Sequence, residues 1–435
     1  MWMTPDRFRW SSFALVLMAG SIALLLRLGL LPELDARQGR SYLTVSDERL
    51  RDPEPENWLM YRRTYNGWGF SPLDQITSRN VTDLSPVWVF QTGVFNEHHQ
   101  SPPIVNDGTM FITTGSNVIA LDAATGQLLW RYVRQLPEDL VTRHPTNRGV
   151  ALYEDKVFVG TLDAHVVALD GTTGAVIWEQ SVEDYRRGYY VTMAPLVAEG
   201  KVILGTSGGE QGIRGFVTAL DAGTGELLWM HRLDEGERGA AAPRRLSGRG
   251  LAYRAHEDGG QIFYVTPGYQ LLGLDAATGR RLASFGTDGI VDLKQNFDQD
   301  LDLITGEAGL HAAPIVAGST IVVGAAHLPG STPRSMANVK GYIRGFDADS
   351  GDRKWIFHTI PGADEFGNDS WLNESWRYTG NTGVWGQISV DLELGIAYLP
   401  TEMPTNDYYG GHRHGDNLFS DSLVAGDLET GDRLW

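Results

Sequence analysis

A short motif recurs six times along this chain of 435 residues, and it constrains the fold more than any other feature. Each copy is close to hydrophobic-x-x-(Leu/Phe)-Asp-x-x-(Thr/Ser)-Gly, and most copies carry Trp four residues after the glycine. The copies are VIALDAATGQLLW, VVALDGTTGAVIW, VTALDAGTGELLW, LLGLDAATGRRLASF, IRGFDADSGDRKW and LVAGDLETGDRLW, with their aspartates at Asp122, Asp170, Asp221, Asp275, Asp347 and Asp427. Repetition on this scale indicates an array or ring of similar structural units.

Each copy predicts two short strands joined by a tight turn. Asp122 is expected to accept backbone N–H groups of its own turn, and Gly126 to supply the positive φ that closes it. The repeated aspartates are therefore assigned to the scaffold rather than to catalysis. Upstream of the first copy, SPPIV and MFITTG are two more strand-like runs on either side of Asn106-Asp107-Gly108. Four strands per repeat predict the blades of a β-propeller.

The spacing and the tryptophans of the repeat extend this prediction. Successive turn aspartates lie 48, 51, 54, 72 and 80 residues apart, so the later blades are expected to carry long loop insertions. A large ring on the outer strand can wedge between neighbouring blades. The tryptophans expected in this role are Trp130, Trp178, Trp229, Trp355 and Trp435.

Composition agrees with one large all-β domain and excludes several functions. The chain has 52 Gly and 19 Pro for turns, and 42% hydrophobic residues to fill a core. A net charge of -18 argues against nucleic acid as a partner. The chain has no cysteine, which excludes disulfides, thiolate metal sites and thiol nucleophiles.

The amino end differs from the rest of the chain. Two arginines precede a stretch of fourteen uncharged residues, Phe13 to Leu26, and this pattern indicates export through the inner membrane. We expect residues 1–32 to form a hydrophobic helix that acts as a signal anchor or signal peptide, and residues 33–55 to form a tether. The propeller, residues 56–435, would then lie in the periplasm, anchored to the membrane by this helix.

One segment, TSGGEQGIRG at residues 206–215, goes beyond what a blade needs. A carboxylate behind two glycines in a loop lies where backbone can approach a ligand closely and an oxygen can bind a hard cation. The same residues also make a plain exposed turn, so the segment alone leaves both interpretations open.

Larger parts of the chain resemble a known family. NWLMYRRTYNGWGFSPLDQITSRNVTDLSPVW, HPTNRGVALY, TLDAHVVALD and TSGGEQGIRGFVTALD, within residues 57–229, resemble the amino-terminal half of pyrroloquinoline-quinone-dependent alcohol dehydrogenases. LDEGERG, VTPGYQLLGLDAATG and NVKGYIRGFDADSGDRKWIFHTIPG, within residues 230–435, resemble the membrane glucose-dehydrogenase type. The resemblance implies an eight-bladed quinoprotein propeller, of which about six blade repeats are present. It also implies a quinone and a calcium or lanthanide ion on the central axis.

The resemblance also implies site residues. Arg148 and Thr192 would hydrogen-bond the oxygens of the quinone, Trp385 would stack on its ring, and Glu210 would be a carboxylate ligand of the metal. The expected quinone contacts are Gln100, Arg148, Thr192, Ser207, Gly208, Gly209 and Trp385. Residues of these types suit the quinone, which is a flat tricarboxylate. Its oxygens need cationic and hydroxyl donors, and its ring needs an aromatic side chain to stack on.

The sequence departs from the family pattern at several places. Gln100 stands where the family usually has glutamate, and residues 143–146 replace a pair of adjacent cysteines. The second metal ligand of the family, an asparagine, falls on Met403, whose thioether is a poor calcium ligand. We hypothesise that Glu402 takes its place. The catalytic aspartate of the family would lie about a dozen residues beyond Trp435, so the catalytic residue is unknown.

Two functions fit this sequence. The first is a periplasmic quinoprotein dehydrogenase that oxidises a small alcohol or a sugar hydroxyl and passes electrons to cytochrome c or ubiquinone. The alternative is a non-catalytic propeller scaffold, or an inactive hybrid or fragment of a quinoprotein. Met403 and the missing aspartate favour the alternative. The residues expected around the quinone favour the enzyme, because a scaffold does not need them.

Overall fold

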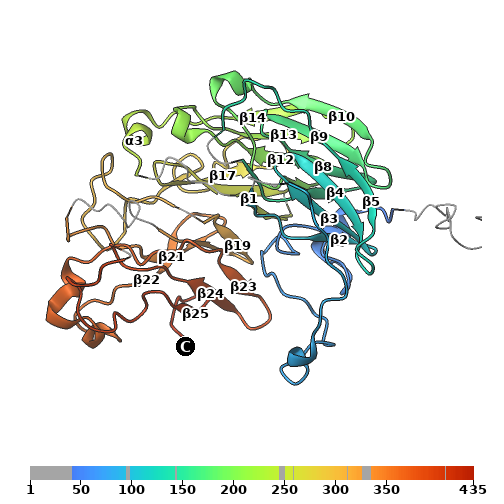
Figure 1. Ribbon diagram of the computed structural model, residues 1–435. Coiled ribbons are helices and arrows are strands. Elements are labelled where there is room, and N and C mark those ends of the chain that lie inside the picture. Colours follow the sequence, from blue (N-terminus) through green and yellow to red (C-terminus); the bar gives the residue numbers. More distant parts are fainter. Residues whose placement is uncertain are drawn as a thin grey trace, which may run out of the picture. The chain divides into compact units, whose positions relative to one another are not determined.

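The computed structural model describes residues 42–94, 98–142, 145–243, 250–257, 259–310, 312–325, 335–406 and 408–435 (Figure 1). The described helices are short: α2 (Asp47–Arg51), α3 (Gly236–Ala240), and the 3₁₀ helices η1 (Val81–Asp83), η2 (Tyr185–Arg187), η3 (Gly209–Gln211), η4 (Asn368–Ser370) and η5 (Leu372–Arg377). None of these described helices has the length and apolar character to cross a membrane. The predicted hydrophobic helix, residues 1–32, lies outside the described residues.

Within the described residues, six sheets of three or more strands follow the chain order of the repeat, five with four strands and one with three. The first and second sheets contain β2 (Ile104–Asn106), β3 (Thr109–Thr114), β4 (Asn117–Asp122), β5 (Leu128–Tyr132), and β7 (Ala151–Tyr153), β8 (Lys156–Gly160), β9 (His165–Asp170), β10 (Val176–Ser181). The third and fourth contain β11 (Leu196–Ala198), β12 (Lys201–Gly205), β13 (Val217–Asp221), β14 (Leu227–His231), and β15 (Ala252–Arg254), β16 (Gln261–Val265), β17 (Gln270–Asp275), β18 (Ile290–Asp292). The fifth and sixth contain β19 (Ile315–Ala317), β20 (Thr320–Val323), β21 (Ile343–Asp347), β22 (Arg353–Phe357), and β23 (Ser389–Asp391), β24 (Ile396–Pro400), β25 (Leu423–Asp427).

Each of these sheets is an antiparallel meander, as the repeat predicts. In addition, β1 (His98–His99) pairs in parallel with β6 (Thr146–Asn147) between the first and second sheets. Buried side chains fill the space between neighbouring sheets, and one such cluster joins Val217 and Trp229 of the third sheet to Ile262 and Leu274 of the fourth. The all-β prediction is confirmed for the described residues, while the count of eight blades stays a prediction.

The turn of the repeat has the predicted hydrogen bonds. Asp122 Oδ1 accepts the backbone N–H groups of Ala124 at 3.0 Å and Thr125 at 2.9 Å, and also the Thr125 hydroxyl at 2.9 Å. Gly126 has a φ of 71°, a left-handed conformation that glycine adopts without strain. The assignment of the repeated aspartate to the scaffold therefore has a direct structural basis.

The outer-strand tryptophans join neighbouring sheets. The Trp130 ring covers Gly174 of the next repeat so closely that a Cβ there would lie 2.5 Å from a ring carbon. The indole N–H of Trp130 donates to the carbonyl oxygen of Gly171 at 3.1 Å. The same joint recurs at Trp178 and Gly225, Trp229 and Gly279, and Trp355 and Gly431. The predicted wedge is confirmed at these four positions, and it requires glycine at the turn.

Two further contacts on turn glycines are not predicted by the repeat. Trp88, outside the six motif copies, covers Gly126 in the same way, and its indole N–H donates to the carbonyl oxygen of Ala123 at 3.2 Å. The fourth copy lacks tryptophan, and there Gly351 packs on Val291 instead. A side chain of the neighbouring sheet thus packs on the turn glycine even where that side chain is not tryptophan.

The first strands of the six sheets converge on the segment that precedes them in the chain, residues 43–69. This segment touches each sheet at or beside its first strand, through Val45 with Glu154, Trp58 with Val105, Tyr65 with Val197 and Tyr253, Gly67 with Ile315, and Arg62 with Ser389. The sheets therefore surround a common axis, and residues 43–69 pack along part of it.

Candidate cofactor site

A cavity of about 350 Å³ lies on this axis, where the first strands converge. Gln100, Arg148 and Trp385 all line it, although they come from three different sheets. Each lies in the short segment that precedes a first strand: β2, β7 and β23, respectively. Trp385 keeps 46% of its surface exposed, so a ligand can contact its ring. The structure thus brings three of the predicted quinone contacts to one cavity.

The axial cavity is positively charged. Arg62 and Arg148 line it, and none of the described residues that line it carries a carboxylate. Burial lowers the pKa of both arginines, which shows that their charges are poorly solvated. Arg62 donates to the carbonyl oxygen of Gly67 at 2.9 Å and to the hydroxyl of Ser389. Two guanidinium groups with uncharged partners favour an anionic ligand.

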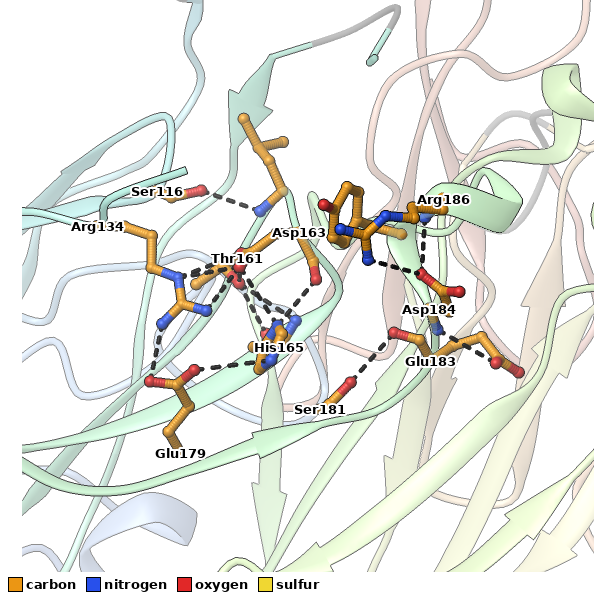
Figure 2. A network of polar contacts seen from close by, with 12 residues as sticks. Ser116, Arg134, Thr161, Asp163, His165, Glu179, Ser181, Glu183, Asp184 and Arg186 are labelled. Atoms are coloured by element: carbon orange, nitrogen blue, oxygen red, sulfur yellow. Dashed lines mark hydrogen bonds and ion pairs between the residues drawn. The ribbon is translucent and has the colours of Figure 1, made fainter. Parts of the chain in front are cut away.

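A network between the first and second sheets shows what a structural arginine looks like in this fold (Figure 2). Arg134 contacts Asp163 Oδ2 at 2.6 Å and Glu179 Oε2 at 2.8 Å. Burial lowers the pKa of Arg134, but the hydrogen bonds to the two carboxylates outweigh it and raise that pKa. This arginine is neutralised within the protein, whereas no carboxylate of the described residues forms an ion pair with Arg62 or Arg148 of the axial cavity.

Three predicted residues form a hydrogen-bonded chain beside the cavity. Arg148 Nη1 donates to Thr192 Oγ1 at 2.9 Å, and Thr192 Oγ1 lies 2.8 Å from Ser207 Oγ. Backbone bonds hold the same segments together, from Arg148 N to Thr192 O at 3.0 Å and from Ser207 N to Tyr190 O at 2.8 Å. Thr192 and Ser207 therefore fix the position of the Arg148 guanidinium.

The two glycines that follow Ser207 have different surroundings. Gly208 has a φ of 120°, and a Cβ on it would lie 2.1 Å from the carbonyl oxygen of Gly188. Contact between backbones thus requires glycine here, whether or not a ligand is bound. Gly209 begins η3 and lines a second cavity rather than the axial one.

Glu210 has one carboxylate oxygen without a partner. The Tyr190 hydroxyl donates to Glu210 Oε1, while Glu210 Oε2 is buried and has no hydrogen bond from the described residues. A buried carboxylate oxygen without a donor suits a bound cation. Glu402, the other predicted ligand, lines neither cavity, and its backbone N–H donates to Gly383 O at 2.8 Å. Within the described ranges, no three His, Asp or Glu side chains gather into a metal cluster.

Arg62 is the residue of this site that the sequence analysis did not identify. It belongs to the segment NWLMYRRTYNGWGF, which carried the family resemblance without any residue role. The local signal was a pair of adjacent arginines within a stretch rich in aromatic residues. Only the folded arrangement shows that one of them, Arg62, reaches the axial cavity.

Comparison with known sequences finds relatives among quinoprotein alcohol dehydrogenases. Relatives include quinoprotein alcohol dehydrogenase PedH of Pseudomonas putida, 42% identical over 206 residues, which are 46% of this chain and 35% of PedH. Quinohemoprotein alcohol dehydrogenase ADH IIB of Pseudomonas putida is 44% identical over 176 residues, 40% of this chain and 25% of that protein. The chain thus spans about a third or less of the length of these relatives.

Solved structures support the same fold. A europium-containing methanol dehydrogenase has a TM-score of 0.56 at 20% identity, over 88% of this chain and 78% of that one. The quinohemoprotein alcohol dehydrogenase from Comamonas testosteroni has a TM-score of 0.55 at 22% identity, over 87% of this chain and 66% of that one.

A family model provides the broadest match. The model for PQQ proteins, described as glucose/ethanol/alcohol dehydrogenase, β-propeller domain, matches residues 58–214 and 178–435. Together the two matches cover all six sheets and every described lining residue of the axial cavity except Leu50. The chain therefore belongs to the family of pyrroloquinoline-quinone (PQQ) dehydrogenase β-propeller domains.

Proposed function

We propose that this chain takes part in PQQ-dependent oxidation of an alcohol. The observation that carries the proposal is the axial cavity, which has two arginines and no carboxylate among its described lining residues. PQQ is a flat molecule with three carboxylates, so it matches both the charge of the cavity and the exposed ring of Trp385. The relatives named above are quinoprotein and quinohemoprotein alcohol dehydrogenases, which favours an alcohol as the substrate.

The roles of the residues follow from their chemistry. Arg148, held by Thr192 and Ser207, and Arg62 would bind carboxylates of the quinone through charge-assisted hydrogen bonds. Trp385 would provide a flat apolar surface for its ring. When bound, the quinone would accept two electrons from the alcohol, and a metal ion would polarise its reactive carbonyl.

The proposed metal is calcium or a lanthanide. Glu210 would provide the buried oxygen that has no donor, and Glu402 would replace the asparagine of the family pattern. Oxygen ligands of this kind suit hard cations. We assign the role of catalytic base to none of the described residues.

We also propose where the reaction takes place. The charge pattern of residues 1–32 favours export, so the propeller would lie in the periplasm and be anchored to the inner membrane. Electrons would then leave to cytochrome c or ubiquinone. The substrate class extends to a sugar hydroxyl through the resemblance of residues 230–435 to glucose dehydrogenases.

The test combines binding with turnover. PQQ and calcium are added to the purified chain, the absorbance of bound quinone is recorded, and dye reduction is followed with ethanol and with glucose. We expect bound quinone and alcohol-dependent reduction. Absence of bound quinone would contradict the proposal, and bound quinone without turnover would favour the inactive alternative. In a parallel calcium titration, Glu402→Gln tests the second ligand, since an unchanged calcium affinity excludes it.

A further inference from the structure

The segments that carry Arg148 and Thr192 lie side by side. One segment directly precedes β7, the first strand of the second sheet, and the other precedes β11, the first strand of the third. The backbone N–H of Arg148 donates to the carbonyl oxygen of Thr192 at 3.0 Å, and Arg148 Nη1 donates to Thr192 Oγ1 at 2.9 Å. The position of this guanidinium therefore depends on what fixes the two segments to the blades.

Both segments are fixed at one place in the second sheet. The side chain of Asn147, which directly precedes the arginine, donates from Nδ2 to the carbonyl oxygen of Gly160 at 2.9 Å. The backbone N–H of Val191, which directly precedes the threonine, donates to the carbonyl oxygen of Thr161 at 3.0 Å. Two adjacent carbonyl groups thus hold both segments, and we name residues 160–161 the β8 end.

The β8 end also packs directly on the segment of Thr192. A Cβ on Gly160 would lie 2.3 Å from Val191 Cγ1. The φ of Gly160 lies outside the left-handed region, so close packing rather than backbone conformation requires glycine here. Direct contact and a hydrogen bond therefore both fix the distance between this segment and the second sheet.

Asn147 fixes the course of the chain at Arg148 as well. Its Oδ1 accepts the backbone N–H of Gly149 at 2.8 Å, so one side chain joins the residues on both sides of the arginine. Gly149 has a φ of 122°, which residues with a side chain rarely adopt. Asn147 is only 1% exposed and does not line the axial cavity. Its effect on a ligand in that cavity must therefore pass through its neighbours.

The network around Arg134 holds the β8 end itself (Figure 2). Thr161 Oγ1 donates to Asp163 Oδ1 at 2.6 Å, and Arg134 Nη2 donates to Asp163 Oδ2 at 2.6 Å. Arg134 follows β5, so the network ties the β8 end to the first sheet. Asp163 is buried and does not line the axial cavity.

We propose that Asn147 is a positioning residue for Arg148, and that Asp163 supports it by fixing the β8 end. A long side chain that is ordered before a ligand binds loses less conformational entropy on binding. Asn147 thus increases the affinity for a planar anion without touching it. The inference rests on the proposed function for the identity of this anion as the quinone, whereas the ordering of Arg148 is testable without quinone.

The first measurement is the rate at which phenylglyoxal, a reagent for guanidinium groups, modifies Arg148 in the purified chain without quinone. Peptide mass spectrometry gives this rate separately for Arg148 and for Arg62. We expect Asn147→Ala to raise the rate at Arg148 about tenfold, because the guanidinium is then no longer held against Thr192. The rate at Arg62, which Gly67 and Ser389 hold, should stay unchanged.

The matched control is Asn106→Ala. Asn106 is also 1% exposed, and its side chain also makes two hydrogen bonds, donating to the carbonyl oxygen of Leu43 and accepting from Arg49. It does not line the axial cavity. This variant loses a buried asparagine away from Arg148, so both modification rates should equal those of the unmodified chain.

The second measurement is the Kd for PQQ in a double-mutant cycle, by fluorescence titration. Asn147→Ala should raise this Kd about thirtyfold when Arg148 is present and less than about twofold when residue 148 is already alanine, because a positioning residue acts only through the residue that it holds. A general structural defect would weaken binding by the same factor in both backgrounds.

Asp163→Asn keeps the proposal testable if Asn147→Ala does not fold. It retains the side-chain shape and removes the charge that pairs with Arg134, so the modification rate at Arg148 should rise about threefold. An unchanged rate at Arg148 in the folded variant, an equal rise at Arg62, or the same loss of PQQ affinity in both Arg148 backgrounds would overturn the proposal. If the unmodified chain binds no PQQ, the proposed function fails, and the modification rates still decide whether Asn147 orders Arg148.

Discussion

The axial cavity and the network around Arg134 hold arginines in opposite ways. In the axial cavity, no carboxylate of the described residues pairs with Arg62 or Arg148, whereas Arg134 is paired with Asp163 and Glu179. Both arrangements are built on the same repeated sheets. Arg62 and Arg148 lie in short segments outside the blade strands, so the scaffold positions these segments and the segments determine the charge of the cavity.

Loss of Arg148 should produce the largest single effect on this contrast. Arg148→Ala removes a guanidinium that Thr192 and Ser207 hold in place, and charge-assisted bonds contribute about 1.5–3 kcal/mol each. We expect the Kd for quinone to rise about a hundredfold. Fluorescence titration measures this Kd. Arg186→Ala, at an exposed surface arginine, is the control, and a normal quinone affinity in Arg148→Ala would refute the role of Arg148.

The second guanidinium should contribute less. Arg62 already donates to Gly67 and Ser389, so fewer of its N–H groups remain for a ligand. We expect Arg62→Ala to weaken quinone binding about tenfold. Circular dichroism checks that the variant remains folded. If the folded variant binds quinone normally, Arg62 has only a structural role.

Substitution of Trp385 tests the shape of the axial cavity rather than its charge. Stacking of aromatic rings contributes about 0.5–1.5 kcal/mol beyond buried area, so Trp385→Leu should weaken quinone binding about fivefold. Trp385→Phe keeps an aromatic ring and should restore most of the affinity. Equal binding by the leucine and phenylalanine variants would show that the ring does not stack.

Salt should have the smallest effect on quinone binding. Raising ionic strength from 0.1 to 1 M shortens the Debye length from about 10 to about 3 Å. We expect the Kd of the anionic quinone to rise about threefold, because screening weakens its attraction to Arg62 and Arg148. Parallel titrations at both salt concentrations measure this. A quinone affinity that is insensitive to salt would argue against a cationic site.

Much of the fold could be predicted from the sequence because the repeat acts locally. The hydrogen bonds of Asp122 and the positive φ of Gly126 lie within one turn, so each motif copy contains the information for its own hairpin. Asp302 shows the limit of this reasoning. It accepts the N–H groups of Ile304 and Thr305 in the same way, yet this turn lies between β18 and β19 and joins no blade strands.

The site was only partly predictable. Arg148, Thr192 and Ser207 were predicted from family resemblance, and the structure places them in one hydrogen-bonded chain. The place of Arg62 in the axial cavity depends on contacts between distant segments, which no local pattern encodes. Gly208 was assigned to the quinone, but its contact with the Gly188 carbonyl already requires glycine.

The central claim is that the cationic axial cavity binds PQQ. The most direct measurement is a titration of the purified chain with PQQ, followed by tryptophan fluorescence, beside the double variant Arg62→Ala/Arg148→Ala. The account predicts saturable binding with one quinone per chain, weakened about a thousandfold in the double variant while its circular dichroism spectrum is retained. Equal affinity of the two proteins, or no saturable binding by the unmodified chain, would contradict it.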